Sequence, residues 1–226
     1  MVLPPPFVHT LPHYDLKLHR SCHDATHNNP NDNEAPYYEV WDLWLNDLIL
    51  HQKDYSLRPQ GVLSLRITQQ QKKKKQKSSV AKRTPDFIVY HNGDVEVDGN
   101  YTVRRDVAFI AEVKPWDKGM TEDRNMLVDE FHDRDFLDQV RDHAKMIMIK
   151  HEKVRVWLVQ CVGLFWRAGS LRNEGISPFS NRAPTGKNLP RKHVELVEWG
   201  PIEKIGDVPS DMQETVFWRN VSHDIE

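Results

Sequence analysis

The segment Asp-Val-Ala-Phe-Ile-Ala-Glu-Val-Lys-Pro, residues 106–115, constrains the fold of this 226-residue chain more than any other. Residues 106–113 are nearly all apolar, which predicts a strand that is buried on both faces, and Pro115 ends it. Glu112 and Lys114 are two residues apart, so their side chains point to the same face of the sheet. Because an unpaired buried charge is costly, this strand needs partners for both groups.

Helical and extended patterns alternate along the chain. Apolar residues recur at helical spacing in 33–50 and in a long segment from about 129 to 150. Shorter runs predict strands at 61–68, 86–90, 106–113, 153–166, 193–199 and 214–218, and 153–166 is either one strand or two joined at Gly163. Asn92-Gly93 and Asp98-Gly99 predict turns after the second strand. A strand, a long helix and a strand in succession favour an α/β fold with a central mixed sheet flanked by helices.

Two segments differ from this pattern. Residues 1–33 are rich in Pro, His, Asn and Asp, and they predict an irregular extension before a single α/β domain over 34–226. Five histidines lie in the extension, but their spacing matches no standard zinc ligand set, which favours solvated polar residues. Residues 69–83 hold seven Lys or Arg and almost no apolar residue, so we expect a flexible basic loop there. This loop is either a solvated segment or an arm that binds phosphates.

Composition limits the classes of partner. The net charge of −2 gives no basic signature for the whole molecule, so any case for nucleic acid depends on local charge. Two distant cysteines do not form a disulfide framework, which suits a reducing compartment. No apolar stretch approaches the roughly 20 residues that span a bilayer, and the N-terminus does not resemble a signal peptide. We therefore expect an intracellular protein, cytoplasmic or nuclear, with no membrane partner.

The acidic residues of two predicted strands suggest a metal site. Asp86 opens its strand after Pro85, and pairing with the next strand would place it beside Glu112. Two neighbouring buried carboxylates repel each other, and Mg²⁺ removes that conflict, with Mn²⁺ as a substitute. The backbone carbonyl of Val113 would add a ligand, and Lys114 would hold a water nucleophile or neutralise a phosphate. The structural alternative is that Asp86 caps a turn, while Glu112 and Lys114 form a salt bridge at a sheet edge.

The motifs PD at 85–86 and EVK at 112–114 resemble those of the PD-(D/E)XK nuclease superfamily, which has the restriction-endonuclease-like fold. The resemblance covers roughly residues 34–165. It implies Mg²⁺-dependent hydrolysis of phosphodiester bonds in nucleic acid, with DNA the expected partner. The proline-, histidine- and tryptophan-rich composition of the chain also resembles that of fungal members of this superfamily. A catalytically inactive module on the same fold, which binds nucleic acid or protein, is the second reading, since a fold does not fix a function.

Two further elements of the superfamily have candidates in this chain. Gln139 and His143 lie four residues apart on one helical face, and they resemble the Gln-x3-Tyr element of one branch, with His in place of Tyr. The resemblance implies that Gln139 supports the substrate phosphate or Lys114, and the alternative is a surface residue. Members of the superfamily often carry a further glutamate on the first helix. Glu34 and Glu39 are the candidates, and Glu34 shares its helical face with apolar residues.

Overall fold

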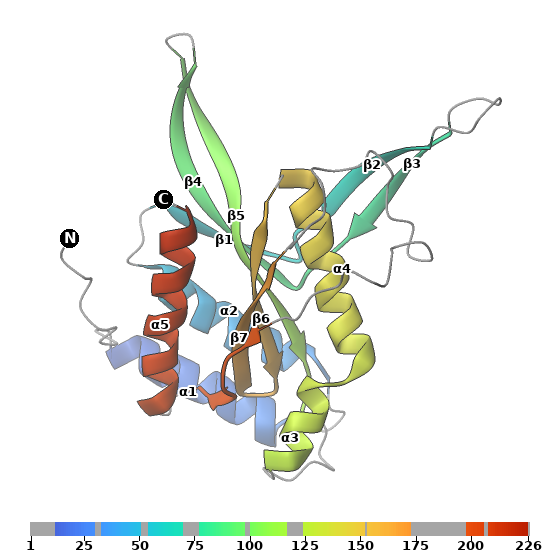
Figure 1. The fold of residues 1–226 in the computed structure, drawn as a ribbon. Coiled ribbons are helices and arrows are strands. Elements are labelled where there is room, and N and C mark those ends of the chain that lie inside the picture. The colour runs from blue at the N-terminus through green and yellow to red at the C-terminus, as the bar shows by residue number, and fades with distance from the viewer. Residues whose placement is uncertain are drawn as a thin grey trace.

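One mixed sheet of seven strands forms the centre of the molecule, and helices cover both of its faces (Figure 1). The computed structural model describes residues 12–29, 33–50, 54–69, 77–97, 100–116, 124–151, 153–172, 198–205 and 208–225. The strands lie in the order β1-β4-β5-β6-β7-β8, and β9 also pairs with β7. Their bounds are β1 Tyr55–Pro59, β4 Phe87–Val97, β5 Asn100–Lys114, β6 Arg155–Val162, β7 Phe165–Arg172, β8 Glu198–Trp199 and β9 Glu203–Lys204. The expected α/β class is confirmed.

The helices divide between the two faces according to the side-chain alternation of the sheet. Along β5, Phe109 and Val113 belong to the core under α1 (Pro12–His27), α2 (Ala35–Leu50) and α5 (Val208–Ile225). Ile110 belongs to the opposite core, under α3 (Arg124–Phe131) and α4 (Arg134–His151). Successive side chains of a strand point to opposite faces, so Glu112 lies on the α3–α4 face. Within the parts of the chain described, no helix is long and apolar enough to cross a membrane.

The connection between β5 and β6 has the arrangement that the sequence predicted. The two strands are parallel, with Glu112 opposite Gln160, and the helices between them lie on one face of the sheet. The single long helix expected from about 129 to 150 is instead two helices, because the chain bends at His132 and Asp133. Asp133 caps α4 by accepting the backbone N–H of Phe136 at 2.9 Å, which is the usual role of an acid at this position.

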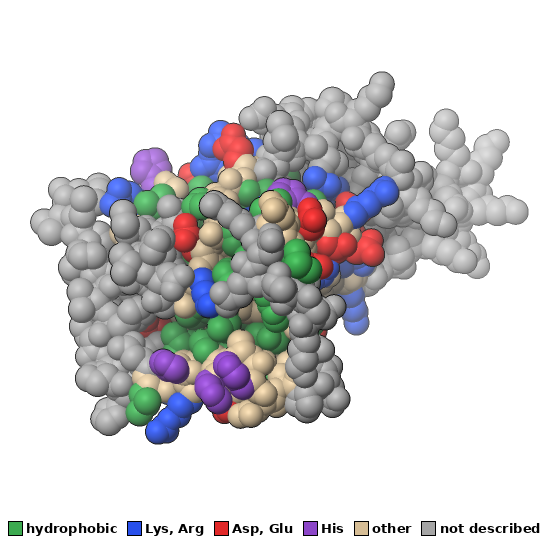
Figure 2. All heavy atoms as spheres, turned by 90° about the horizontal axis from the view of Figure 1, so that it is seen from below, with side chains coloured by type: hydrophobic (Ala, Val, Ile, Leu, Met, Phe, Trp, Pro, Cys, Tyr) green, Lys and Arg blue, Asp and Glu red, His purple; other side chains and the backbone are tan. Residues whose placement is uncertain are grey.

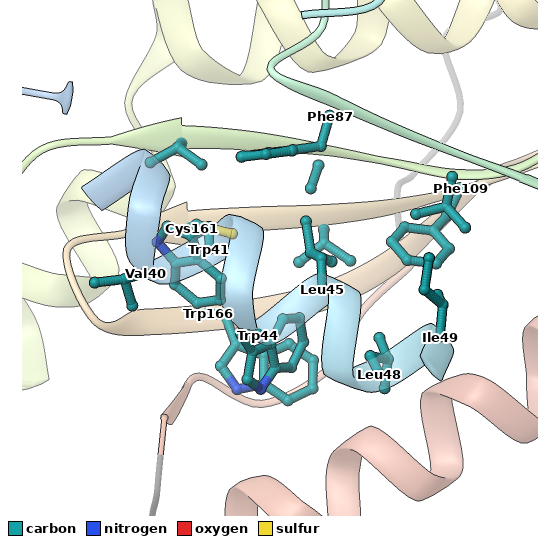
Figure 3. Close-up of a cluster of buried hydrophobic side chains, with 14 of the residues drawn as sticks. Val40, Trp41, Trp44, Leu45, Leu48, Ile49, Phe87, Phe109, Cys161 and Trp166 are labelled. Atoms are coloured by element: carbon teal, nitrogen blue, oxygen red, sulfur yellow. The ribbon is translucent and has the colours of Figure 1, made fainter. Parts of the chain in front are cut away.

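Aromatic packing fixes α2 on the sheet (Figure 3). Trp41 and Trp44 point from the helix toward the strands, where Trp44 packs against Trp166 of β7 at 5.2 Å between ring centroids. The Trp41 indole N–H donates to the carbonyl of Gly163 at 2.9 Å, so its one polar atom is satisfied in the core. Each large apolar side chain buried in this way contributes roughly 1.5–3 kcal/mol. The helix predicted over 33–50 is confirmed, with its first residue at Ala35.

The N-terminal segment differs from the expectation. Residues 12–27, which the sequence assigned to an irregular extension, form the helix α1. It packs on α2 through Leu18 and Ala25, and the Ser21 hydroxyl donates to the Glu39 carboxylate at 3.1 Å. The apolar residues of α1 are few, so its periodicity is weak in the sequence and its stability comes from docking. Figure 2, which views the molecule from below, shows histidine side chains in more than one place, and some of them lie close together.

The basic segment also differs from the expectation. β2 (Leu63–Gln69) confirms the strand predicted at 61–68, but residues 77–83, which were expected in a flexible loop, form its partner β3 (Lys77–Arg83). The lysine run at 72–75 lies outside the described residues. At the base of this hairpin Leu63 is buried in the α4 core, and Arg83 pairs with Asp142 of α4 at 3.1 Å. The hairpin is thereby attached to α4 where the chain enters Asp86.

Two other local predictions were wrong. Asn92-Gly93 is part of β4, where Gly93 pairs with Arg104, so β4 and β5 continue past the sheet as a two-stranded arm (Figure 1). Residues 98–99 lie outside the described residues. The segment 214–218, expected as a strand, belongs to α5. It places the adjacent residues Phe217 and Trp218 in the same core, which a helix allows and a strand, with its alternating side chains, does not.

The remaining strand predictions are settled only in part. The run 153–166 is two antiparallel strands, β6 and β7, joined at Gly163 and Leu164. Gly163 has a φ of 57°, and a Cβ there would lie 2.8 Å from the side chain of Trp116, so glycine is required on both grounds. Of the strand predicted at 193–199, the described part is β8, Glu198–Trp199, which pairs with β7.

Candidate functional site

Asp86 lies at the point where the basic hairpin enters the sheet, directly before β4. Its Oδ1 accepts the hydroxyl proton of Tyr38 from α2 at 2.7 Å. Its Oδ2 accepts the backbone N–H of Val113 from β5 at 2.7 Å. The carboxylate is therefore held by one group from a helix and one from the neighbouring strand, which fixes its position against the end of β5.

Glu112 lies beside Asp86 on the α3–α4 face, and its residue is only 1 % exposed. Two side chains of α4 approach it: Gln139 donates from Nε2 to Oε2 at 3.1 Å, and His143 contacts Oε1 through Nδ1. Helical spacing of four residues places both groups over the same strand position. Gln139 thus supports Glu112 rather than Lys114, and His143, which has 3 % of its surface exposed, is part of the same cluster.

The Asp86 and Glu112 carboxyl groups lie near each other at neighbouring strand ends, and each affects the pKa of the other. Burial raises the pKa of Glu112 well above its usual value, and the charge and hydrogen bond of Asp86 raise it further. Burial also raises the pKa of Asp86, but the hydrogen bonds from Tyr38 and Val113 oppose that shift. Without a cation, Glu112 is therefore the group that keeps the proton and Asp86 is the anion.

The contact between His143 and Glu112 has the geometry of an ion pair, but burial disfavours the charged form of both groups. Burial lowers the pKa of His143 to about 4, and the nearby charge of Arg83 acts in the same direction. His143 of α4 contacts the Glu112 carboxyl of β5, which lies beside Asp86.

Lys114 lies on the same face as Glu112, as their spacing predicted. Its Nζ donates to Asp133 Oδ1 at 2.5 Å and lies 4.8 Å from the centre of the Phe136 ring. Asp133 is the residue that caps α4, so the helix start carries the partner of the lysine. This ion pair lowers the pKa of the Asp133 carboxyl. The Lys114 side chain is 28 % exposed, so it is only partly buried.

The structure distinguishes between the two candidate glutamates. Glu34 directly precedes α2, and its Oε2 lies 3.3 Å from the Tyr38 hydroxyl that also binds Asp86. Burial raises the pKa of Glu34, the charge of Asp86 raises it further, and the charge of Lys114 opposes the shift. Glu34 is therefore close enough to the site to interact with its charges. Glu39 instead accepts the hydroxyl of Ser21 and faces α1.

Sequence reasoning missed Tyr38. Its hydroxyl lies between two carboxylates, and burial together with these acids raises its pKa, so it remains a neutral donor. It is four residues after Glu34, and this spacing is the one signal in the sequence that could have suggested the contact. The neighbouring Tyr37 is part of the apolar pattern of the helix, so the sequence indicated a core position for Tyr37 and gave no role to Tyr38.

The donor set fits a hard divalent cation. Each oxygen of the Asp86 and Glu112 carboxyl groups has one hydrogen-bonding partner, and a carboxylate oxygen has a second lone pair for a metal. Among the described residues no group of three or more His, Cys, Asp or Glu side chains is arranged to hold a metal ion. Mg²⁺ often binds through one or two carboxylates and fills its other positions with water and phosphate oxygens, so two acids are sufficient.

The comparisons with known proteins add nothing to this geometry: no protein-family model matches the chain, and no curated protein matches it.

Proposed function

We propose that the chain is a metal-dependent nuclease that hydrolyses phosphodiester bonds of nucleic acid, with DNA as the substrate to test first. One observation supports this most: Asp86, directly before β4, and Glu112, near the end of β5, lie close enough to affect each other's pKa, with Lys114 on the same face as Glu112. A cluster of two buried acids is electrostatically unfavourable, which a purely structural role would not require. We also propose that the protein acts inside the cell, in the cytoplasm or nucleus.

Each residue has a role in this proposal. Asp86 and Glu112 would bind Mg²⁺ or Mn²⁺, with the backbone carbonyl of Val113 as a further ligand. The bound cation would activate a water molecule and offset charge on the phosphate. Lys114 would orient the attacking water or bind the phosphate while its contact with Asp133 holds the ammonium in place. Gln139 would hold Glu112 in its ligand orientation by the hydrogen bond that it makes now.

The base of the β2–β3 hairpin supports a nucleic-acid substrate. Lys82 and Arg83 are exposed at the end of β3, three to four residues before Asp86. Basic side chains next to a phosphate-cleaving site supply affinity that is independent of sequence and sensitive to salt. Arg83 is partly engaged with Asp142, so Lys82 is the group that is more available to a phosphate.

The test compares the wild type with Lys114→Ala and with the control variant Lys145→Ala, whose lysine lies on α4. Supercoiled plasmid, single-stranded DNA and RNA are incubated with each protein in Mg²⁺ or Mn²⁺, and with EDTA as a blank. The expected result is cleavage by the wild type and by the control, with loss of cleavage in Lys114→Ala and in EDTA. If every substrate stays intact with the wild type in both metals, the nuclease proposal is wrong.

A catalytically inactive binding module is the second candidate, and one observation favours it. Every ionisable group of the site already has a partner within the protein: Asp86 with Tyr38, Glu112 with His143, and Lys114 with Asp133. A calorimetric titration with Mn²⁺ separates the two candidates. Heat that disappears in Glu112→Gln supports the nuclease site, and its absence from the wild type supports the binding module.

A further inference from the structure

Arg167 of β7 is a buried cation with no role in the proposed reaction. Its residue is 3 % exposed, and burial lowers the pKa of its guanidinium to about 10. The guanidinium lies between two aromatic rings, 4.4 Å from the centre of Trp199 and 5.1 Å from that of Phe131. The groups that receive its hydrogen bonds are neutral. A buried arginine of this kind needs an explanation, because desolvation of a charge is costly.

The register of the sheet links Arg167 to the candidate site. Glu112 of β5 lies opposite Gln160 of β6, and Gln160 lies opposite Arg167 of β7. All three side chains point to the α3–α4 face and are almost fully buried. The Arg167 Nε–H donates to Gln160 Oε1 at 2.9 Å. Because arginine can only donate, this contact fixes which end of the Gln160 amide faces the guanidinium.

The other end of the guanidinium holds the corner between α3 and α4. Its Nη2 donates at 2.5 Å to the carbonyl of Phe131, the last residue of α3, where helix carbonyls have no partner of their own. Its Nη1 lies 3.5 Å from Nε2 of His132. The Nδ1 of that ring contacts the Val128 carbonyl at 2.7 Å and must donate to it, so Nε2 is the acceptor in the neutral ring.

Asp133 is the next residue of this corner, and it binds Lys114. Arg167 therefore contacts the consecutive residues Phe131 and His132 of this corner. The residue that follows them, Asp133, positions the ammonium group of the lysine. We propose that Arg167 is a positioning residue for Lys114, which it controls by fixing the α3–α4 corner so that Asp133 stays against the lysine. Gln160 anchors the guanidinium from the sheet. The inference rests on the proposed function for its catalytic meaning, but the positional claim can be tested without any cleavage.

The primary experiment measures how fast Lys114 is labelled by reductive methylation in the whole protein, followed by peptide mass spectrometry. The variants are Arg167→Lys, which keeps the charge but loses the forked geometry, and Arg167→Met. Arg155→Lys is the matched control, because Arg155 pairs with Asp224 of α5 and contacts no residue of the site. Lys145 and Lys150 of α4 report general loosening of the helix.

Loss of a partly exposed ion pair should raise the labelling rate of Lys114 by about two- to fivefold in both Arg167 variants. The rates of the two α4 lysines and of the Arg155→Lys control should not change. Asp133→Asn, which keeps a cap for α4, should give the same increase, and combining it with Arg167→Lys should add nothing further. Such non-additivity would show that the arginine acts through Asp133.

Two outcomes overturn the inference. One is an unchanged labelling rate for Lys114 in a folded Arg167→Lys variant, and the other is an equal rise at Lys114 and the α4 lysines, which would show only a looser fold. Where the wild type cleaves nucleic acid, kcat should also fall by roughly ten- to a hundredfold with KM nearly constant. A wild type that cleaves nothing, together with the specific labelling change, would refute the nuclease while leaving the positioning role of Arg167 intact.

Discussion

Two acids of this protein, Glu112 and Asp224, are held in opposite ways. Asp224 of α5 receives two hydrogen bonds from Arg155 at 2.7 and 2.9 Å and a third from the Trp157 indole at 2.7 Å. The charge of Asp224 is offset by Arg155 of the same chain, and the pair is open to solvent. Glu112 is buried beside another acid, and its partners from α4 are neutral. The arrangement at Asp224 is sufficient as a structural contact. The arrangement at Glu112 has no cationic partner within the protein, as expected for an acid that binds a metal ion.

The largest expected effect is that of Glu112→Gln. Replacing a buried acid that lies against a second acid should raise the stability of the metal-free protein at pH 7 by roughly 1–3 kcal/mol, and should abolish any metal binding. Urea unfolding in EDTA measures the stability. The matched exchange Asp224→Asn should do the opposite and destabilise. If Glu112→Gln were as destabilising as its counterpart, the two acids would be equivalent and the comparison would fail.

The pH dependence of stability should distinguish the same region. The pKa values of Asp86 and Glu112 are raised in the folded state, so the unfolded chain releases these protons first as pH rises. Stability should therefore fall as pH increases from the ordinary carboxyl pKa to the raised values. His143, whose pKa is lowered to about 4, acts in the opposite direction below its usual value. The difference in unfolding free energy between the wild type and Glu112→Gln, measured from pH 5 to 8, isolates the part of the pH dependence that the Glu112 carboxyl causes. A constant difference over that range would contradict the assignment.

Tyr38→Phe should have a smaller effect, because it removes a single hydrogen bond and keeps the ring. Asp86 would lose its donor from α2, and the variant should be less stable by about 0.5–1.5 kcal/mol at pH 7. The pKa of Asp86 should rise further, since Tyr38 favours its charged form. Urea unfolding at pH 5 and pH 7 measures both changes, because the loss should be larger at the higher pH. Equal losses at both values would show that the hydroxyl does not stabilise the anion.

The smallest expected effect is that of Asp224→Asn. The pair with Arg155 is open to solvent, so the loss should be about 1 kcal/mol or less and should shrink in high salt. Thermal unfolding at low and high NaCl measures it, and metal titrations should be unchanged. A loss of binding heat on this exchange would mean that the two acids are coupled through the sheet.

Much of the site could be read from neighbouring positions in the sequence. The spacing of Glu112 and Lys114 placed them on one face, and the strand after Pro85 placed Asp86 opposite them, because both follow from the period of a strand. Tyr38 and Asp133 could not be found in this way. Each reaches the site from a different helix, and their approach depends on how α2 and α4 pack on the sheet.

Secondary structure was readable where the pattern was strong and failed where tertiary contacts stabilise the element. The apolar run at 107–111 of β5 and the aromatic spacing of α2 determine their own structure. The polar helix α1 and the strand β3 have weak patterns, and they are stabilised by α2 and by the pairing with β2. The segment at 214–218 was expected as a strand but forms part of α5, because a run of so few apolar residues does not distinguish a helix from a strand.

The sequence by itself determined the α/β class, the acids on two strands and the lysine beside one of them, because strand periodicity is a local property. Only the tertiary structure decided that Glu34 rather than Glu39 faces the site, that His143 and Gln139 hold Glu112, and that Asp133 holds Lys114. These contacts join segments that are distant in the chain. Their geometry is set by helix packing on the sheet and by the corner that Arg167 fixes, neither of which any local pattern encodes.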